Sequence, residues 1–323
     1  MQYKTLGRTG VQVSPLCFGT MSFGGDADAA MSAKMYKACR DAGINFFDTA
    51  DQYNKGRSEE ILGELIGGQR DDLVIATKCY NPVSEDVNAR GGSRRHVVRA
   101  VEASLRRLRT DRVEILFLHQ MDPLTPIEET LRGFEDLVRA GKVLYPGLSN
   151  HSAWLTQQGL AAQERNGWAR LQIIQPMYNL VKRQAEVEIL PMAAANNVAV
   201  IPYSPGGGGL LSGKFADQAA QGRIAANKQY AARYGEPWMH EVAAKFAAFC
   251  KQHGWHPMSA AVAWCGAHPA VTAPIIGARN TDQLQASLDS VKIPMTPELY
   301  AEMAALSRTP PPATDRTEEQ KKG

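Results

Sequence analysis

The chain of 323 residues is poor in cysteine, and its cysteines follow no motif. There are five of them, an odd number, and no two have CxxC spacing. This pattern argues against a disulfide framework and favours a reducing compartment, where thiols stay free. We therefore expect five free, buried thiols, at Cys17, Cys39, Cys79, Cys250 and Cys265.

Long apolar runs are absent as well. No stretch approaches the ~18 consecutive apolar residues that a membrane-spanning helix requires. The first residues, Met1–Leu6, lack the apolar core of a signal peptide. We expect a soluble, cytoplasmic protein that has no membrane partner.

Neither sign of charge predominates. The 36 Lys and Arg residues nearly balance the 33 Asp and Glu residues, which gives a net charge of +3. No basic block stands out, so we expect no nucleic-acid partner.

Two common nucleotide-binding motifs are missing or incomplete. No Gly-x-Gly-x-x-Gly opens a helix after the first strands, which disfavours a Rossmann dinucleotide site. Residues 208–214 match the Gly-x-x-x-x-Gly-Lys of a P-loop, but Phe215 stands where the magnesium-binding Ser or Thr would be. Any dinucleotide would therefore have to bind by another route.

What the chain does contain is a series of eight short apolar runs separated by helical patterns. This alternation predicts parallel strands joined by crossover helices. The composition, 44% hydrophobic and 21% charged, is ordinary for a globular protein, and barrels of roughly 250 residues or more are single domains. We predict an α/β fold, a (β/α)8 TIM barrel over residues 1–308, and a mobile polar tail over residues 309–323. The predicted strands are Leu16–Gly19, Asn45–Asp48, Leu73–Lys78, Val113–His119, Val143–Ser149, Ile173–Gln175, Val198–Ser204 and Val271–Gly277.

Helical periodicity and glycine stop signals predict the helices between these strands. Two further features are expected outside the repeat. Residues 2–14 should form an N-terminal β-hairpin that closes the bottom of the barrel, and a long loop, Gly206–Glu236, should follow strand seven as a lid or cofactor cover. The predicted helices are Asp28–Ala42, Ser58–Ile66, Ser93–Leu108, Ile127–Ala140, Ala153–Glu164, Ala185–Ala195, Met239–His253, Pro257–Ala267 and Asp282–Val291.

Polar residues stand where several predicted strands end. In a parallel barrel the carboxyl ends of all strands share one rim, so Asp48, Lys78 and His119 should face one pocket. Tyr53 follows closely after Asp48. A tyrosine that works as a general acid near neutral pH needs its pKa lowered, by ~2–3 units; Lys78 is the candidate cation, and Asp48 would keep Lys78 charged. The alternative is an ordinary loop tyrosine beside a structural ion pair.

His119 has two further interpretations. It can be a buried core histidine, or it can donate a hydrogen bond to a substrate oxygen from its place on the rim. With Asp122 it supplies only two potential metal ligands, and no third has diagnostic spacing, so we predict no metal site.

Anion-binding elements follow the last two predicted strands. Gly206–Gly209 and Gly277–Asn280 lie where barrels often bind phosphate, and glycines let backbone N–H groups approach an anion closely. A helix that begins near Asp282 adds a positive dipole end, and Arg279 offers a two-pronged donor for a phosphate monoester. The alternative is a flexible hinge and a surface arginine.

Taken together, these residues resemble the aldo-keto reductase family, in particular a bacterial-type branch similar to channel β-subunit-like members. The resemblance implies a (β/α)8 barrel that binds NADPH or NADP+ without a Rossmann fold and reversibly reduces an aldehyde or ketone to an alcohol. It extends over residues 1–306. The stretches that carry it are residues 18–21, 46–50 with Tyr53, 56–60, 76–78, 118–119, 147–150, 175–179, 202–205 and 276–279.

The resemblance also implies roles for individual residues. The catalytic residues would be Asp48, Tyr53, Lys78 and His119, with Tyr53 as the proton donor. Arg279 would favour NADPH over NADH by binding the 2′-phosphate. Ser149, Asn150 and Gln175 would hold the carboxamide, Tyr203 would stack on the nicotinamide, and residues 205–211 with Lys214 would cover the pyrophosphate. The implied cofactor-binding residues are Gly19, Thr20, Asp48, Ser149, Asn150, Gln175, Tyr203, Ser204, Gly206, Gly208, Leu210, Lys214, Gly277, Arg279 and Gln283.

The partner expected on this basis is a small-molecule carbonyl substrate. Two other functions stay open at this point: a cofactor-binding regulatory subunit with little turnover, and a barrel hydrolase or aldolase that uses Lys78 as a Schiff-base nucleophile. The sequence does not define the oligomeric state. The candidate substrate-pocket residues are Met21, Phe23, Tyr80, Met121 and Trp238.

Overall fold

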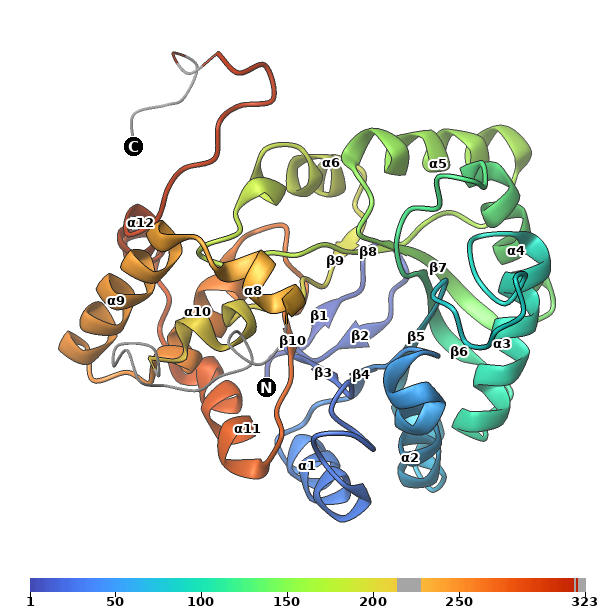
Figure 1. Cartoon of the computed structure of the whole chain (residues 1–323), viewed down its shortest axis with the longest axis horizontal. Coiled ribbons are helices and arrows are strands. Elements are labelled where there is room, and N and C mark those ends of the chain that lie inside the picture. Colours follow the sequence, from blue (N-terminus) through green and yellow to red (C-terminus); the bar gives the residue numbers. More distant parts are fainter. Residues whose placement is uncertain (214–227, 317, 319–323) are drawn as a thin grey trace.

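Eight parallel strands form the centre of the structure, a computed structural model that describes residues 1–213, 228–316 and 318. The strands follow the order β10-β3-β4-β5-β6-β7-β8-β9, and every neighbouring pair is parallel. Figure 1 shows the helices arranged around these strands. The α/β prediction is therefore confirmed. The strands are β3 (Cys17–Gly19), β4 (Phe46–Asp48), β5 (Val74–Cys79), β6 (Val113–Leu118), β7 (Val143–Ser149), β8 (Ile173–Gln175), β9 (Ala199–Val200) and β10 (Ile275–Ile276).

The sheet curls so that its two outermost strands approach each other. The backbone N–H of Ile275 donates to the carbonyl of Pro202 over 2.8 Å, and that of Thr272 donates to the carbonyl of Val200 over 2.8 Å. Both outer strands are shorter than the predicted runs. Pro202 and Pro274 interrupt the ladder because proline has no N–H to donate.

The strands bury two distinct layers of side chains. Residues that point into the curl form one cluster, the interior cluster, and residues that point outward pack against the helices. An antiparallel pair, β1 (Lys4–Thr5) and β2 (Gln12–Val13), also contributes to the interior cluster. Leu6, directly after β1, and Val13, at the end of β2, are fully buried in it. The strand members of the interior cluster are Cys17, Phe46, Val74, Ala76, Ile115, Phe117, Ile173, Ala199 and Ile275.

Most of the helices begin at side-chain caps that the sequence supplies. Asp28, Ser93 and Ser152 each accept a hydrogen bond from a backbone N–H in the first turn of the following helix. The helices that match predicted segments are α1 (Ala29–Asp41), α2 (Arg57–Ile66), α3 (Arg94–Leu108), α4 (Ile127–Arg139), α5 (Ala153–Asn166), α6 (Ile189–Ala195), α9 (Pro237–Gln252), α10 (Pro257–Ala267) and α11 (Thr281–Leu288).

Among the residues that the structure describes, two helices were not predicted. α8 (Lys228–Tyr234) lies within the segment expected to be a loop, and α12 (Pro297–Ala305) precedes the C-terminal segment. Both are short and depend on tertiary contacts: Tyr234 of α8 and Met303 of α12 are fully buried. The described residues also include short 3₁₀ segments, η1 (Tyr53–Gly56), η2 (Arg70–Asp72), η3 (Gln184–Glu186), η4 (Gly207–Ser212) and η6 (Asp289–Lys292).

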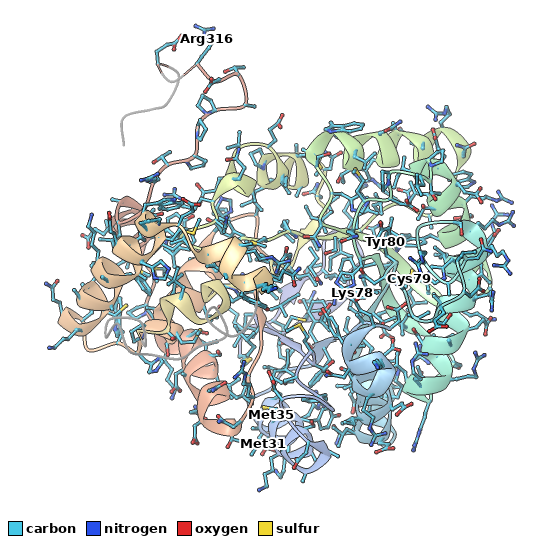
Figure 2. The ribbon with its side chains drawn as sticks, in the orientation of Figure 1. Met31, Met35, Lys78, Cys79, Tyr80 and Arg316 are labelled. Atoms are coloured by element: carbon cyan, nitrogen blue, oxygen red, sulfur yellow. The ribbon has the colours of Figure 1, made fainter. Side chains whose placement is uncertain are left out.

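All five cysteines are free and buried, as predicted. Within the described ranges, no helix has both the length and the apolar character that crossing a membrane requires. Figure 2 shows Lys78 near the centre of the ring of helices and Arg316 in the segment that extends from the body toward the C-terminus.

Candidate active site

The side chains of the site continue the alternation of the interior cluster. Asp48 lies two residues after Phe46, and Lys78 two residues after Ala76. His119 likewise follows Phe117, and Gln175 follows Ile173. Because side chains alternate between the two faces of a strand, each polar residue points to the same side as the apolar residue below it. The site is therefore a polar layer above the interior cluster, on the concave side of the curled sheet.

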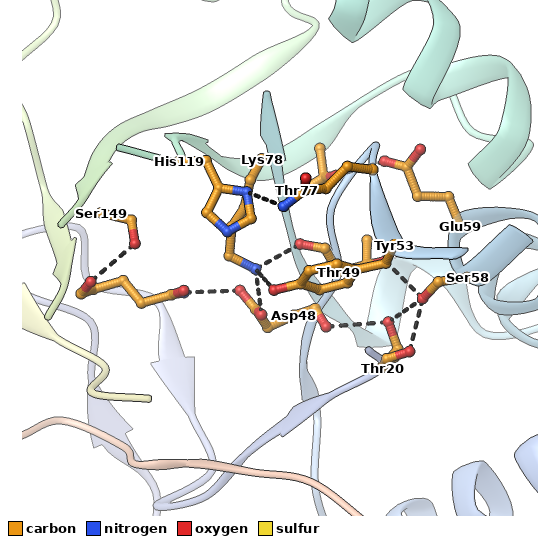
Figure 3. A network of polar contacts seen from close by, with 12 residues as sticks. Thr20, Asp48, Thr49, Tyr53, Ser58, Glu59, Thr77, Lys78, His119 and Ser149 are labelled. Atoms are coloured by element: carbon orange, nitrogen blue, oxygen red, sulfur yellow. Dashed lines mark hydrogen bonds and ion pairs between the residues drawn. The ribbon is translucent and has the colours of Figure 1, made fainter. Parts of the chain in front are cut away.

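Lys78 is the centre of this layer. Its side chain has no exposed surface, and all three of its N–H donors are used. Nζ lies 2.5 Å from Asp48 Oδ2, 2.7 Å from the Thr49 carbonyl oxygen and 3.2 Å from the Tyr53 hydroxyl (Figure 3). Burial by itself would lower the pKa of Lys78, but the adjacent Asp48 and Tyr53 outweigh it and raise the pKa. The amine is therefore a charged ammonium, which is a poor Schiff-base nucleophile.

Asp48 is held from both sides. Oδ2 accepts from Lys78, and Oδ1 accepts from the Gln175 side-chain amide over 2.9 Å. The backbone carbonyl of Asp48 accepts from the N–H of Thr20 over 2.8 Å. Both carboxylate oxygens thus have partners, which is what a buried carboxylate requires.

Tyr53 reaches the site from a tightly turned segment. Asn54 and Lys55, directly after it, have φ of 49° and 56°, and Gly56 has φ of 89°. The Asn54 side-chain amide donates to the Phe23 carbonyl over 2.7 Å, which anchors this strained backbone. The Tyr53 ring meets the His119 imidazole edge-on, with centroids 5.9 Å apart.

The expectation that the pKa of Tyr53 falls is wrong for this structure. Burial raises the pKa of the Tyr53 phenol, and the attraction of Lys78 does not outweigh it because Asp48 adds a negative charge nearby. The phenol is consequently protonated at neutral pH and holds a proton that it can donate.

His119 is neutral and lies beside Tyr53 at the edge of the same cluster. Burial, and then the charge of Lys78, lower the pKa of His119 to about 3. The Gln52 side-chain amide lies 3.5 Å from His119 Nδ1. Since an amide N–H can only donate, this contact favours the tautomer with its proton on Nε2. The Asn150 side chain holds the His119 backbone through a 2.9 Å bond to its carbonyl.

Four of the predicted cofactor-binding side chains form one connected group. Ser149 Oγ donates to the Gln175 carbonyl over 3.0 Å, and Asn150 Nδ2 donates to Ser149 Oγ over 3.2 Å. The Tyr203 hydroxyl donates to Asn150 Oδ1 over 2.7 Å. Gln175 also reaches Asp48, so this group adjoins the Lys78 cluster directly.

The glycine segment after β9 has a left-handed backbone conformation at three successive residues. Gly207, Gly208 and Gly209 have φ of 60°, 64° and 101°. A Cβ on Gly208 would lie 2.6 Å from the ring of Tyr230. Packing against α8 thus requires glycine here independently of any ligand. Of the other predicted cofactor-binding residues in this segment, Ser204 is half-buried and Leu210 is buried. Lys214 lies outside the described residues.

Arg279 has a partner that the sequence did not reveal. Its Nε lies 3.0 Å from Asp26 Oδ2, and both side chains are about half exposed, at 44% and 47%. The Gln283 side chain accepts from the Arg279 backbone N–H over 3.1 Å. The loop that carries Asp26 is tied to the same strand end, because Ser22 Oγ donates to the Ala278 carbonyl over 2.6 Å. Gly277 beside them is exposed.

The predicted substrate-pocket residues divide into two groups. The prediction that Phe23 lines the substrate pocket was wrong, because Phe23 is fully buried and packs on Phe18 with ring centroids 5.7 Å apart. Met21 and Met121 are exposed, at 40% and 45%, and Tyr80 and Trp238 are half-buried. Met121 borders a cavity of 240 Å³ beside the start of α5.

Asp122, considered above as a metal ligand, serves the loop structure. Its two carboxylate oxygens accept from the backbone N–H groups of Gly92, over 2.6 Å, and Leu124, over 2.9 Å. In the part of the chain that the structure describes, no three His, Cys, Asp or Glu side chains are grouped to hold a metal ion.

The structure thus brings a phenol, an ammonium, a carboxylate and an imidazole together at one end of eight parallel strands. The family model of the Aldo/keto reductase family matches residues 15–308, and the chain belongs to that family. The resemblance seen in the sequence is therefore confirmed.

Individual relatives match nearly the whole chain. The chain is 38% identical to the uncharacterized oxidoreductase YrpG of Bacillus subtilis (strain 168), with 93% of this chain and 94% of the relative covered. It is 33% identical to a probable voltage-gated potassium channel subunit beta of Oryza sativa subsp. japonica, over 98% and 99%. It is 31% identical to the versiconal hemiacetal acetate reductase of Aspergillus parasiticus, over 92% and 94%. The family and its oxidoreductase members support carbonyl reduction as the general chemistry.

Proposed function

We propose that this protein uses NADPH to reduce an aldehyde or ketone to an alcohol and that Tyr53 protonates the carbonyl oxygen. The observation that carries the proposal is the Tyr53 hydroxyl 3.2 Å from a fully buried Lys78 ammonium, which Asp48 keeps charged. A protonated phenol next to a fixed cation can release its proton at the moment when negative charge develops on a substrate oxygen.

The residues around this cluster fit a nicotinamide cofactor. Ser149, Asn150 and Gln175 carry hydroxyl and amide groups, which complement a primary carboxamide, and they already form a linked group beside Asp48. Tyr203 would lie against the nicotinamide ring, and Arg279 would bind the 2′-phosphate. When bound, the reduced cofactor supplies a hydride to the carbonyl carbon.

The chain's own residues perform the proton chemistry. Nε2–H of the neutral His119 orients the carbonyl oxygen by a hydrogen bond, and Tyr53 donates its hydroxyl proton to that oxygen. Lys78 stabilises the resulting phenolate, and Asp48 keeps Lys78 charged. We place this chemistry on a closed (β/α)8 barrel, in which the β1–β2 pair closes the bottom and the loop after β9 lies on the cofactor side.

The direct test is turnover with a panel of aldehydes and ketones, followed by the absorbance of NADPH or NADH. Wild-type protein should oxidise NADPH in the presence of some of these carbonyls, and Tyr53→Phe should not. A protein that is idle with the whole panel, and no different from the Tyr53→Phe variant, contradicts the proposal.

The name of the rice relative supports a second candidate, a cofactor-binding subunit of a larger assembly with little turnover. The same experiment separates the two functions. A protein that binds NADPH tightly but reduces nothing in the panel fits this second function and not the first.

The ion pair between Arg279 and Asp26 predicts opposite effects of two substitutions on cofactor choice. Arg279→Ala should raise the KM for NADPH by roughly 10- to 100-fold, because a charged hydrogen bond to a phosphate is lost. Asp26→Asn should lower this KM by roughly twofold to fivefold, since a half-exposed ion pair that competes for Arg279 is weak. The KM for NADH should change little in either variant.

The measurement is the KM of each cofactor with one saturating carbonyl. Lys292→Ala, which removes an exposed cation paired with Asp289, is the matched control. Equal changes for NADPH and NADH would remove the 2′-phosphate role of Arg279.

A further inference from the structure

A buried carboxyl group lies directly behind the catalytic cluster and takes no part in the mechanism above. Asp51 belongs to the short segment between Asp48 and Tyr53, and only 3% of its surface is exposed. Neither of its carboxylate oxygens has a hydrogen-bond partner among the described residues. A buried carboxylate without partners is costly, whereas a neutral carboxylic acid is far less so.

The groups around Asp51 do not compensate a negative charge. Glu59 on α2 is fully buried and adds a second carboxylate. Its oxygens accept from Thr77 over 2.5 Å and from Arg107 on α3 over 2.7 Å, so the nearest guanidinium is already committed to Glu59. Lys78 on β5 is likewise committed to Asp48 and Tyr53.

Two further neighbours complete the surroundings. The backbone amide of Gln52 lowers the pKa of Asp51, although it makes no hydrogen bond of normal geometry to the carboxylate. The buried thiol of Cys79 on β5 is neutral because burial raises its pKa. The balance of these effects is that burial, and then Glu59, raise the pKa of Asp51 to about 7. The group therefore changes charge near neutral pH.

Hydrogen bonds connect the segment that carries Asp51 to Lys78 and Tyr53. Its backbone N–H donates to the Lys78 carbonyl over 3.1 Å, and the neighbouring Thr49 carbonyl accepts from Lys78 Nζ over 2.7 Å. On the other side, the backbone N–H of Tyr53 donates to the Ala50 carbonyl over 3.2 Å. A charge that appears on Asp51 acts on Lys78 through a medium of low dielectric constant, where it is poorly screened.

We propose that Asp51 is a proton-binding positioning residue that controls the reduction through Lys78. With Asp51 neutral, the positive charge of Lys78 acts on Asp48 and Tyr53 alone and supports the Tyr53 phenolate. With Asp51 ionised, part of that support is cancelled, and Tyr53 becomes a weaker acid. The proton on Asp51 exchanges with solvent and is not consumed, so the overall reaction is unchanged. This inference rests on the proposed function, because it acts through Tyr53.

The test is the pH dependence of kcat for carbonyl reduction in wild type, Asp51→Asn and Asp51→Ala. Between about pH 6 and about pH 9, wild-type kcat should fall roughly three- to tenfold more than kcat of either variant. Asn has the shape of a neutral carboxylic acid, and Ala removes the group, so a packing role would make the two variants differ. Asp41→Asn, which changes an exposed carboxylate, is the control and should keep the wild-type profile.

A second readout does not need turnover. Because the folded-state pKa of Asp51, about 7, lies above its ordinary value of 3.8, the neutral group's contribution to stability is fully present below about pH 4 and is lost progressively as pH rises to about 7. The free energy of unfolding of wild type should therefore decline between about pH 4 and about pH 7 more steeply than that of Asp51→Asn. An active wild type whose alkaline decline in kcat persists in both Asp51 variants overturns this inference alone. An idle wild type overturns the proposed function and this inference with it.

Discussion

Tyr53→Phe is expected to lower the rate of carbonyl reduction by about 10²- to 10⁴-fold, the usual contribution of a positioned general acid. The substitution removes only the hydroxyl that lies 3.2 Å from Lys78 Nζ. The ring, which is half-buried and edge-on to His119, keeps its shape. Cofactor affinity should stay nearly unchanged, since the hydroxyl contacts the Lys78 cluster and not the Ser149–Gln175 group.

This result is measured as kcat with the best carbonyl of the panel, alongside a fluorescence titration with NADPH. Tyr36→Phe provides a matched control, because the Tyr36 hydroxyl is buried and has no hydrogen-bond partner among the described residues. A Tyr53→Phe variant that retains more than about a tenth of wild-type kcat would show that another group donates the proton.

Asp48→Asn is expected to have the largest effect on stability, a loss of about 3–5 kcal/mol in the free energy of unfolding at neutral pH. The substitution leaves Lys78 in the interior without the carboxylate that lies 2.5 Å from its Nζ. Burial then dominates, so the pKa of Lys78 should fall below its ordinary value. Because the folded protein then binds a proton less readily than the unfolded chain does, the variant should lose further stability as pH falls.

The measurement is chemical denaturation of wild type and Asp48→Asn at several pH values, with kcat determined in parallel. Asp41→Asn is the control, because it breaks an exposed pair with Lys37 that should contribute about 0–1 kcal/mol. If the two Asp→Asn variants lose the same stability, the Lys78–Asp48 pair is not the buried, mutually dependent unit described above.

Much of the proposed catalytic layer could be predicted from sequence because it obeys a local rule. At or beside the ends of four strands, a polar residue stands two positions after an apolar residue of the interior cluster, as in Ala76 and Lys78 or Phe117 and His119. Alternation along a strand is a property of the chain itself, and the shared rim follows from the parallel arrangement. The bounds of β7 and β8 were predicted residue for residue for the same reason.

The parts that failed depend on contacts between distant segments. Phe23 stands in a rim loop, and nothing local shows that it turns into the core against Phe18. The Asp26–Arg279 pair joins residues far apart in sequence. The pKa of Tyr53 depends on how burial compares with the opposing charges of Lys78 and Asp48, and that comparison requires the folded geometry.

Gly147 lies below the site, where a Cβ would come within 2.7 Å of the Phe117 ring. A methyl group at this point would displace the phenyl ring, and Phe117 is separated from His119 by a single residue. The residues directly below the site thus belong to the closely packed interior that holds the strands together. Substitutions in peripheral loops, such as the one that carries Met121, can change substrate preference without disturbing this packing. A shift of the His119 imidazole would instead require the interior around Phe117 to repack.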